Sequence, residues 1–205
     1  MAQMGRPRTF DRELALEQAM QLFWEQGYES TSLSQLKARM GAGISAPSFY
    51  AAFGSKEALF HEAVQRYLAS HGQVTECLWD DELAPREAIE RALRRSIRMQ
   101  CEAGHPKGCM VSLGVMSAPS AEYAGVARPL ADSRERTRAG LRHCVERGIR
   151  IDELAADTDA WVMATVFDSF LLGVSIQARD GVPCAQIEGA LSQVLQVWDA
   201  ARASR

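Results

Sequence analysis

Tyr50, Ser55 and Lys56 lie within seven residues of one another, and each can help to bind phosphate. The phenol hydroxyl of Tyr50 and the ammonium group of Lys56 are donors of the kind that contact nucleic-acid backbones. Ser55 fits the position just before a helix, where free backbone N–H groups also attract phosphate. A core tyrosine and a solvated lysine are the alternative interpretation of the same residues, so the surrounding elements decide the chemistry.

The local sequence predicts two short helices and the start of a third around this cluster. Ser32 and Gln35 have the spacing of a capping box, which predicts that a helix begins at Leu33. Ser45 fits the N-cap of the next helix, Gly54 fits its C-terminal end, and the following serine fits the N-cap of the third. Two short helices with a tight connection and a supporting helix are typical of a helix-turn-helix that reads the major groove.

Residues 47–59, with the sequence PSFYAAFGSKEAL, closely resemble the end of the DNA-binding domain of TetR/AcrR-type transcriptional regulators. The resemblance covers about residues 5–68, and its other matching positions are Gly5-Arg6-Pro7-Arg8, Asp11, Gly27-Tyr28 and Thr31-Ser32. It implies an all-α homodimer that binds double-stranded operator DNA. The implied helix-turn-helix domain is 1–55, and the ligand-binding and dimerisation domain is 56–205, with 56–72 as the connecting helix.

The resemblance also implies which residues contact DNA, with Tyr50 and Lys56 as phosphate contacts. In the first turns of the recognition helix, Ser48 can bond a base edge or a phosphate and Ala46 can pack on a thymine methyl group. None of these side chains is a discriminating bidentate reader, so the operator sequence is not predicted. The candidate DNA-binding residues are Arg6, Arg8, Thr31, Lys37, Ser45, Ala46, Ser48, Phe49, Tyr50 and Lys56.

Some of these assignments have a second interpretation. Ser45 is also explained as an N-cap alone, and the arm that holds Arg6 and Arg8 either enters the minor groove or is a charged tail. Phe53 is expected in the core. The sequence departs from the family at Ala52, where a histidine is common, and at 41–44, where the turn is about two residues longer.

The composition is that of an ordinary globular protein, with 47% hydrophobic residues, 24% charged residues and a net charge of −3 over 205 residues. Residues 1–60 contain six basic and six acidic residues, so charge alone does not indicate nucleic-acid binding. No N-terminal run resembles a signal peptide, and the apolar segment Trp161–Ile176 is short for a membrane span and contains Asp168. We therefore expect a cytoplasmic protein that is not in the membrane, with its five cysteines as free thiols.

Helical periodicity continues along the chain and predicts an all-α fold of about nine helices. Residues 73–84 are expected to form a connection, Asp157 to cap a helix and Gly148 to end one. The expected helices outside the two short ones are 11–27, 56–71, 85–103, 128–146, 158–179 and 184–201.

The segment 158–179 is apolar around most of its circumference, so a helix there must be buried on more than one side. In a chain of this size, a subunit interface supplies the second side. The segment and the following helix resemble the last two helices of TetR-type regulators, which pair with those of a second subunit. The implied interface residues are Phe170, Val174, Leu191, Leu195 and Trp198.

Residues 85–180 carry a surplus of methionine and aromatic side chains, which predicts a mainly apolar ligand pocket. The family resemblance implies a repressor that a small molecule releases from its operator, and the predicted pocket indicates that this effector is hydrophobic. The candidate pocket residues are Met99, Cys109, Met110, Met116, Trp161, Phe167 and Phe170, although the same residues are also suited to a core.

Cys101, His105 and Cys109 are spaced by four residues, but the glycines and proline between them break the helix that would align them for metal binding. We predict no metal and no cofactor. Cys109 follows Lys107-Gly108, and a neighbouring ammonium group can lower the pKa of a thiol. Some regulators that resemble this segment sense electrophiles through a cysteine; the other interpretation is a buried cysteine that acts as a small hydrophobe.

No glycine-rich phosphate loop, metal quartet or nucleophile–base signature indicates an enzyme. Two other hypotheses remain beside the ligand-controlled repressor. One is a helix-turn-helix protein without an inducer, and the other is an activator with the same architecture.

Overall fold

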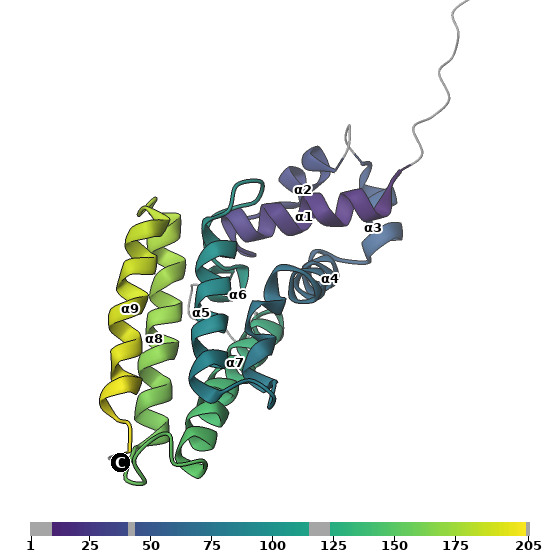
Figure 1. The fold of residues 1–205 in the computed structure, drawn as a ribbon. Helices are drawn as coiled ribbons and strands as arrows, with labels where there is room; N and C mark the ends of the chain where they lie inside the picture. Colours follow the sequence, from purple (N-terminus) through teal and green to yellow (C-terminus); the bar gives the residue numbers. More distant parts are fainter. Residues whose placement is uncertain (1–9, 41–43, 115–123, 204–205) are drawn as a thin grey trace, which may run out of the picture.

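The computed structural model describes residues 10–40, 44–114 and 124–203, and its regular elements there are all helices. This confirms the predicted all-α fold. Figure 1 shows the N-terminal helices at one end and a bundle that includes the two C-terminal helices at the other. The elements are α1 (Arg12–Gln26), α2 (Leu33–Arg39), α3 (Ala46–Phe53), α4 (Lys56–Ala69), the 3-10 helix η1 (His71–Trp79), α5 (Pro85–Cys101), α6 (Met110–Leu113), α7 (Ala124–Arg150), α8 (Ala160–Arg179) and α9 (Cys184–Ala200).

The predicted helix ends of the N-terminal group are confirmed. The side chain of Ser32 accepts a hydrogen bond from the backbone N–H of Gln35 at 3.2 Å, and the Gln35 side chain accepts one from Ser32 at 2.7 Å. Ser45 and Ser55 cap α3 and α4 in the same way. Gly54 ends α3 with a φ of 74°, a left-handed conformation that favours glycine. The helix-turn-helix is therefore held by local contacts.

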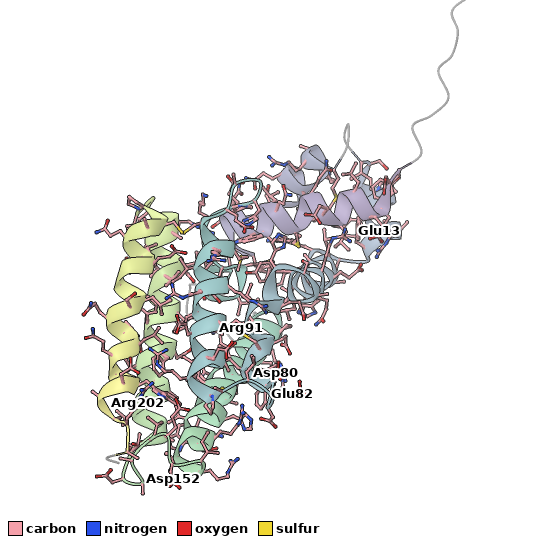
Figure 2. All side chains as sticks on the ribbon, viewed as in Figure 1. Glu13, Asp80, Glu82, Arg91, Asp152 and Arg202 are labelled. Atoms are coloured by element: carbon pink, nitrogen blue, oxygen red, sulfur yellow. The ribbon has the colours of Figure 1, made fainter. Side chains whose placement is uncertain are left out.

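Two buried clusters stabilise the chain. The first joins α1–α4 to α6 and the start of α7 and contains Phe23, Phe49 and Phe60. The second lies among η1, α5, α7, α8 and α9 and contains Phe167 and Trp198. Figure 2 shows Glu13, Asp80 and Arg202 at the outer surface. Since the first cluster continues past residue 55, a domain boundary there stays a prediction.

The structure corrects the prediction that Gly148 ends a helix. α7 continues to Arg150, and Gly148 is buried inside it. A Cβ at Gly148 would lie 2.7 Å from the indole ring of Trp198, so the missing side chain allows α7 and α9 to pack closely. The stop signal in the sequence is therefore a packing site.

Two further predictions about helix ends are wrong. The connection expected at residues 73–84 is helical in its first part, because η1 extends over His71–Trp79. The N-cap of α8 is Asp159 rather than Asp157, and its carboxylate accepts hydrogen bonds from the N–H groups of Trp161 at 2.9 Å and Val162 at 3.0 Å. Either aspartate fits a cap by type, and tertiary packing selects the one nearer the apolar helix.

The 20 residues of α8 make it the one helix, within the described ranges, that is long and apolar enough to cross a membrane. The helix extends beyond the apolar segment Trp161–Ile176 at both ends. The finding is weak evidence for a span, because core helices of soluble proteins meet the same criterion. α8 packs on α7 and α9 and buries Asp168.

Candidate nucleic-acid interface and effector cavity

The N-terminal turn of α3 presents small polar side chains to solvent. Ser45, Ala46 and Ser48 are all exposed. The hydroxyl oxygens of Ser45 and Ser48 lie 2.8 Å apart, so the two side chains hydrogen-bond to each other. The N-cap role of Ser45 is confirmed, since its side chain also accepts from the N–H of Ser48 at 3.3 Å. This end of α3 is exposed, as a helix that enters a groove must be.

Tyr50 and Lys56 flank the turn between α3 and α4. The Tyr50 side chain is 50% exposed. The Nζ atom of Lys56 lies 4.2 Å from the centre of the Tyr28 ring, a cation–π contact that holds the ammonium group in place. Partial burial lowers the pKa of Lys56, and the charge of nearby Glu29 opposes the change. The ammonium group is therefore a positioned donor in the first turn of α4, and the Tyr50 side chain is exposed in α3.

Two of the candidate DNA contacts are corrected by burial. Phe49 is 1% exposed and packs in the core beside Phe53, so its ring is not available to DNA. Thr31 is fully buried, and its hydroxyl donates to the carbonyl of Gly27 at 2.7 Å. Lys37 lies partly exposed in the last turn of α2.

Three sequence features of this interface lie outside the described residues. These are Arg6, Arg8 and the glycine turn at 41–43. Their assignments stay predictions.

Arg12 organises the interface, although the sequence pattern did not single it out. Its guanidinium group makes two hydrogen bonds to the Glu62 carboxylate, at 2.8 and 2.6 Å. It also donates to the carbonyl of Ala52 at 3.3 Å and lies 4.9 Å from the centre of the Phe53 ring. One side chain thus ties the start of α1 to the end of α3 and to α4. No sequence signal links residues 50 positions apart.

Arg179, at the end of α8, connects the N-terminal helices to the bundle. Its guanidinium group donates to the carbonyl oxygens of Trp24 at 2.9 Å, Glu25 at 3.0 Å and Lys107 at 3.1 Å. The first two are among the last carbonyls of α1, which have no partner inside the helix. Burial lowers the pKa of Arg179, and the charge of Glu25 opposes the change. The guanidinium group therefore caps α1 from another part of the fold.

The loop before α6 lies between α1 and α8. The indole N–H of Trp24 donates to the carbonyl of Gly108 at 3.0 Å. Gly108 has a φ of 80°, and a Cβ there would lie 2.6 Å from the carbonyl oxygen of Ser175 in α8. Only glycine fits this approach without moving one of the helices. Arg179, Trp24 and Gly108 thus form one junction, which we call the α1–α8 junction.

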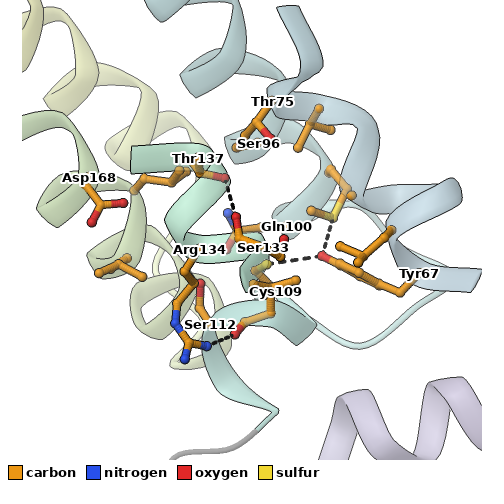
Figure 3. A pocket seen from close by; sticks show the side chains of 17 residues that line it. Tyr67, Thr75, Ser96, Gln100, Cys109, Ser112, Ser133, Arg134, Thr137 and Asp168 are labelled. Carbon is orange, nitrogen blue, oxygen red and sulfur yellow. Dashed lines mark hydrogen bonds between the residues drawn. The ribbon is translucent and has the colours of Figure 1, made fainter. Parts of the chain in front are cut away.

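A cavity lies directly beside this junction, among α4, η1, α5, α6, α7 and α8 (Figure 3). The cavity has a volume of about 50 Å³, and it lies in a wider hollow of about 500 Å³ that includes open solvent. Most of the exposed wall is apolar. The lining residues are Tyr67, Leu68, Gly72, Val74, Thr75, Ser96, Met99, Gln100, Cys109, Val111, Ser112, Ser133, Arg134, Thr137, Asp168, Leu171 and Leu172.

Of the candidate pocket residues, Met99 and Cys109 line this cavity, whereas most of the others lie elsewhere. Met110 and Phe167 are fully buried in the two apolar clusters rather than in the wall. Trp161 is 66% exposed on the outer face of α8, under the guanidinium group of Arg142. Phe170 is half-buried and does not line the cavity. Met116 is not among the described residues.

The cysteines and histidine at spacing four do not form a metal site. No cluster of metal-binding side chains occurs in the described parts of the chain. The His105 ring stacks on Trp24 with the ring centres 4.5 Å apart, and the Cys109 thiol accepts a hydrogen bond from the Tyr67 hydroxyl at 3.2 Å. The ammonium group of Lys107 binds the carbonyls of Cys101 and Glu102, at the end of α5.

The outer face of α8 and α9 is apolar, but four of the five predicted interface residues do not form it, and the fifth, Phe170, is half-buried. Val174, Leu191, Leu195 and Trp198 are at most 3% exposed and face the subunit's own core. An apolar stripe along a helix does not reveal which partner buries it. The large apolar side chains exposed on this face are Trp161, Val162, Val166, Ile176 and Val197.

Comparison with known proteins gives consistent matches. The family model described as "Bacterial regulatory proteins, tetR family" matches residues 15–63. The "HTH-type transcriptional repressor ComR" of Escherichia coli K12 is 30% identical over 197 residues, which cover 95% of this chain and 91% of ComR.

Two solved structures extend the similarity to the whole chain. The TetR family regulator CifR, as a cysteine mutant in complex with 26-base-pair operator DNA, is 39% identical, with a TM-score of 0.83 and coverage of 94% of this chain and 100% of that chain. The reduced form of Escherichia coli NemR is 26% identical, with a TM-score of 0.68 and coverage of 89% and 94%. The match therefore includes the bundle as well as the helix-turn-helix.

Replacement of Arg179 tests the α1–α8 junction. Arg179→Ala should lower the free energy of unfolding by about 1–3 kcal/mol, because two carbonyls at the end of α1 lose their donor. Amide hydrogen exchange should accelerate at the end of α1. Chemical denaturation and exchange mass spectrometry measure the two effects.

The matched control is Arg128→Ala, which removes an arginine of α7 whose side chain is 80% exposed and 3.8 Å from its acidic partner. This change should alter stability by less than about 0.5 kcal/mol. Equal effects of the two substitutions would show that Arg179 is an ordinary surface arginine.

Proposed function

The chain belongs to the TetR family of bacterial transcriptional regulators, and we propose that it is a repressor released from its operator by a small, mainly apolar ligand. DNA binding and transcriptional control are properties of the family. The observation that supports ligand control is the position of the cavity, whose wall residue Cys109 directly follows Gly108 of the α1–α8 junction. A ligand there would act on the contact that orients α1.

The proposed mechanism is a shift between two arrangements of the N-terminal helices. Asp168, Leu171 and Leu172 of α8 line the cavity, and Arg179 lies about two turns beyond Leu172 along the same helix. A displacement of α8 or of the loop at Gly108 would move the carbonyls of Trp24 and Glu25. A ligand that binds one arrangement more tightly stabilises that arrangement. Because two recognition helices must fit half-sites at a fixed spacing, a small rotation lowers operator affinity.

On the DNA side, we propose that Tyr50 and Lys56 bind phosphate while Ser45, Ala46 and Ser48 face the bases. Their exposure and the position of α3 support this assignment. The buried neighbour Phe49 anchors the helix instead. This division follows helical geometry, since adjacent residues on a helix point about 100° apart.

Substitutions of the two phosphate-binding residues test the proposed interface. Lys56→Ala should weaken binding to all duplex sequences and reduce the slope of log K against log salt by roughly one unit. Tyr50→Phe should weaken operator binding without changing the melting temperature, because the exposed ring is retained. Fluorescence anisotropy with a labelled operator at several salt concentrations measures both.

The control is Arg98→Ala, which removes the same charge from an exposed site on α5. It should leave the salt slope almost unchanged. An unchanged affinity and slope for Lys56→Ala would contradict the phosphate role.

We also propose that the protein forms a homodimer through the exposed face of α8 and α9. Five large apolar side chains on this face are at least 37% exposed, and such a patch is typical of a protein interface. Two recognition helices related by a two-fold axis would then match the two halves of an operator. The apolarity of α8 on nearly all sides is explained if a second subunit covers this face.

Charged substitutions on that face test the dimer. Val162→Glu and Ile176→Glu, at positions 60% and 49% exposed, should each produce a folded monomer because the carboxylate would be buried only in the dimer. Size-exclusion chromatography with light scattering gives the mass. Leu14→Glu, at a residue 52% exposed on α1, should stay dimeric. A wild-type monomer at micromolar concentration would refute the interface.

A cysteine-based sensor is a second candidate function. Cys109 lines the cavity and receives the hydrogen bond from Tyr67, which places a thiol where a ligand would enter. The activating ammonium group expected from the sequence is not beside it, since Lys107 caps α5 instead. The solved relatives described as CifR cysteine mutants and reduced NemR give this candidate further support.

Cys109→Ser separates the two modes of release. A reversible ligand should release operator DNA from the variant and from the wild type at similar concentrations. An electrophile should release operator DNA only from the wild type, because the serine hydroxyl of the variant is a poor nucleophile at neutral pH. Operator release by N-ethylmaleimide, followed by mass spectrometry of the Cys109 peptide, measures the difference. Equal release of both proteins by this reagent would refute the sensor.

A further inference from the structure

Two buried polar side chains of α5 line the cavity without hydrogen-bond partners. Ser96 and Gln100 are each 1% exposed. The Ser96 hydroxyl and the Gln100 side-chain oxygen have no partner in the structure. They lie one turn apart, so both belong to the wall that α5 contributes. Buried polar atoms are normally paired, and an unpaired group of this kind costs stability.

The opposite sides of the cavity carry two desolvated charges. Asp168 of α8 is 9% exposed, and neither a hydrogen bond nor an ion pair to its side chain occurs within the described residues. Its pKa is raised, chiefly by burial, while Arg138 and Arg134 act in the other direction. Arg134 of α7 donates to the carbonyl of Val111 at 2.6 Å. Burial also lowers the pKa of Arg134.

These two charges limit the charge of any ligand. A carboxylate beside Arg134 would face the charge of Asp168, whereas an ammonium group beside Asp168 would face Arg134. Either ligand would leave one like-charged group in the same desolvated space. An uncharged polar group avoids this cost. It can donate a hydrogen bond to an acceptor in the wall and accept one from Arg134. The apolar part of the wall then fits an apolar body.

We propose that the cavity binds a compact ligand with an apolar body and one uncharged polar head that both donates and accepts hydrogen bonds. The head donates to Asp168 or to the Gln100 oxygen and accepts from Arg134 or Ser96. Amides and hydroxylated carbonyl compounds have this chemistry. This inference rests on the proposed ligand control, but it concerns recognition rather than release.

Four size-matched probes test the chemistry: toluene, benzamide, benzoate and benzylammonium. Binding to the full chain is measured by isothermal titration calorimetry at neutral pH. Benzamide should bind most tightly to the wild type. Ser96→Ala should weaken the binding of benzamide by roughly 2- to 10-fold, which is the effect of one neutral hydrogen bond. It should leave the affinity for toluene unchanged. The melting temperature of the unliganded Ser96→Ala variant should not fall, because the lost hydroxyl had no partner.

Charge-switch variants provide a reciprocal test. Asp168→Asn should raise the affinity for benzoate relative to benzamide, since the benzoate carboxylate then faces Arg134 without the opposing charge of Asp168. Arg134→Gln should improve benzylammonium for the converse reason. Asp132→Asn, an exposed acid on α7 outside the cavity, should change neither ranking.

The outcomes separate this inference from the proposed function. Toluene binding as tightly as benzamide, a charged probe binding best to the wild type, or no binding by any probe would each overturn the proposed head chemistry. Operator release is measured separately by anisotropy with the same probes. Benzamide that binds but releases no DNA would support the chemistry and refute ligand control. Toluene that binds as tightly as benzamide and releases DNA would refute the chemistry and support ligand control.

Discussion

The capping of α1 by Arg179 is the polar contact that joins the N-terminal helices to α8, beside the apolar cluster that connects them to α6 and α7. The last carbonyls of a helix lack internal partners and carry the negative end of its dipole. Arg179 supplies three donors to Trp24, Glu25 and Lys107, and these residues belong to two different segments. The guanidinium group thus holds α1 and the loop before α6 in a fixed relation to α8. In the proposed mechanism, a change in α8 would reach the N-terminal helices through these polar contacts.

α8 has to satisfy three environments at once. One side packs on the core with Phe167 and Val174, and another contributes Asp168 to the cavity. The outer side presents Trp161 and Val162 to solvent. A helix used on three sides has little room for polar residues, which explains its apolar sequence. The polar exceptions matter for the same reason: a buried aspartate in such a helix reduces stability unless something pairs with it.

The sequence predicts features that depend on neighbours three or four residues away. The capping box at Ser32 and Gln35 and the glycine at Gly54 are correct because local hydrogen bonds and backbone conformation determine them. The burial of Phe49 was also accessible by this reasoning, since it lies four residues before Phe53 on one face of α3. The family resemblance placed Phe49 in the interface, although helical geometry places it in the core.

Features that depend on distant residues were not predictable. Arg179 contacts residues about 155 positions away, and no local pattern distinguishes it from a solvated arginine. Gly148 looks like a helix stop until Trp198 is placed against it. The stripe with Leu191 and Leu195 is compatible with a dimer interface or with an internal core, and only the assembled fold selects the core. The same limit applies to the cavity, where methionine and aromatic content predicted the character of the wall but few of its residues.

The polar groups of the cavity also bear on how a ligand could act. The Ser96 hydroxyl and the Gln100 side-chain oxygen lower the stability of the unliganded chain, since they are buried without a hydrogen-bond partner in the described structure, and burial raises the pKa of Asp168. An apolar replacement at any of them would remove that cost, so stability alone does not account for the arrangement. A ligand that hydrogen-bonds to these groups gains more binding free energy when the helices hold the groups close together than when the helices hold them apart. That difference in affinity, rather than tight binding as such, is what shifts a conformational equilibrium. Because Asp168 and Arg179 lie on one helix, the convergence of the cavity groups and the position of α1 are determined together.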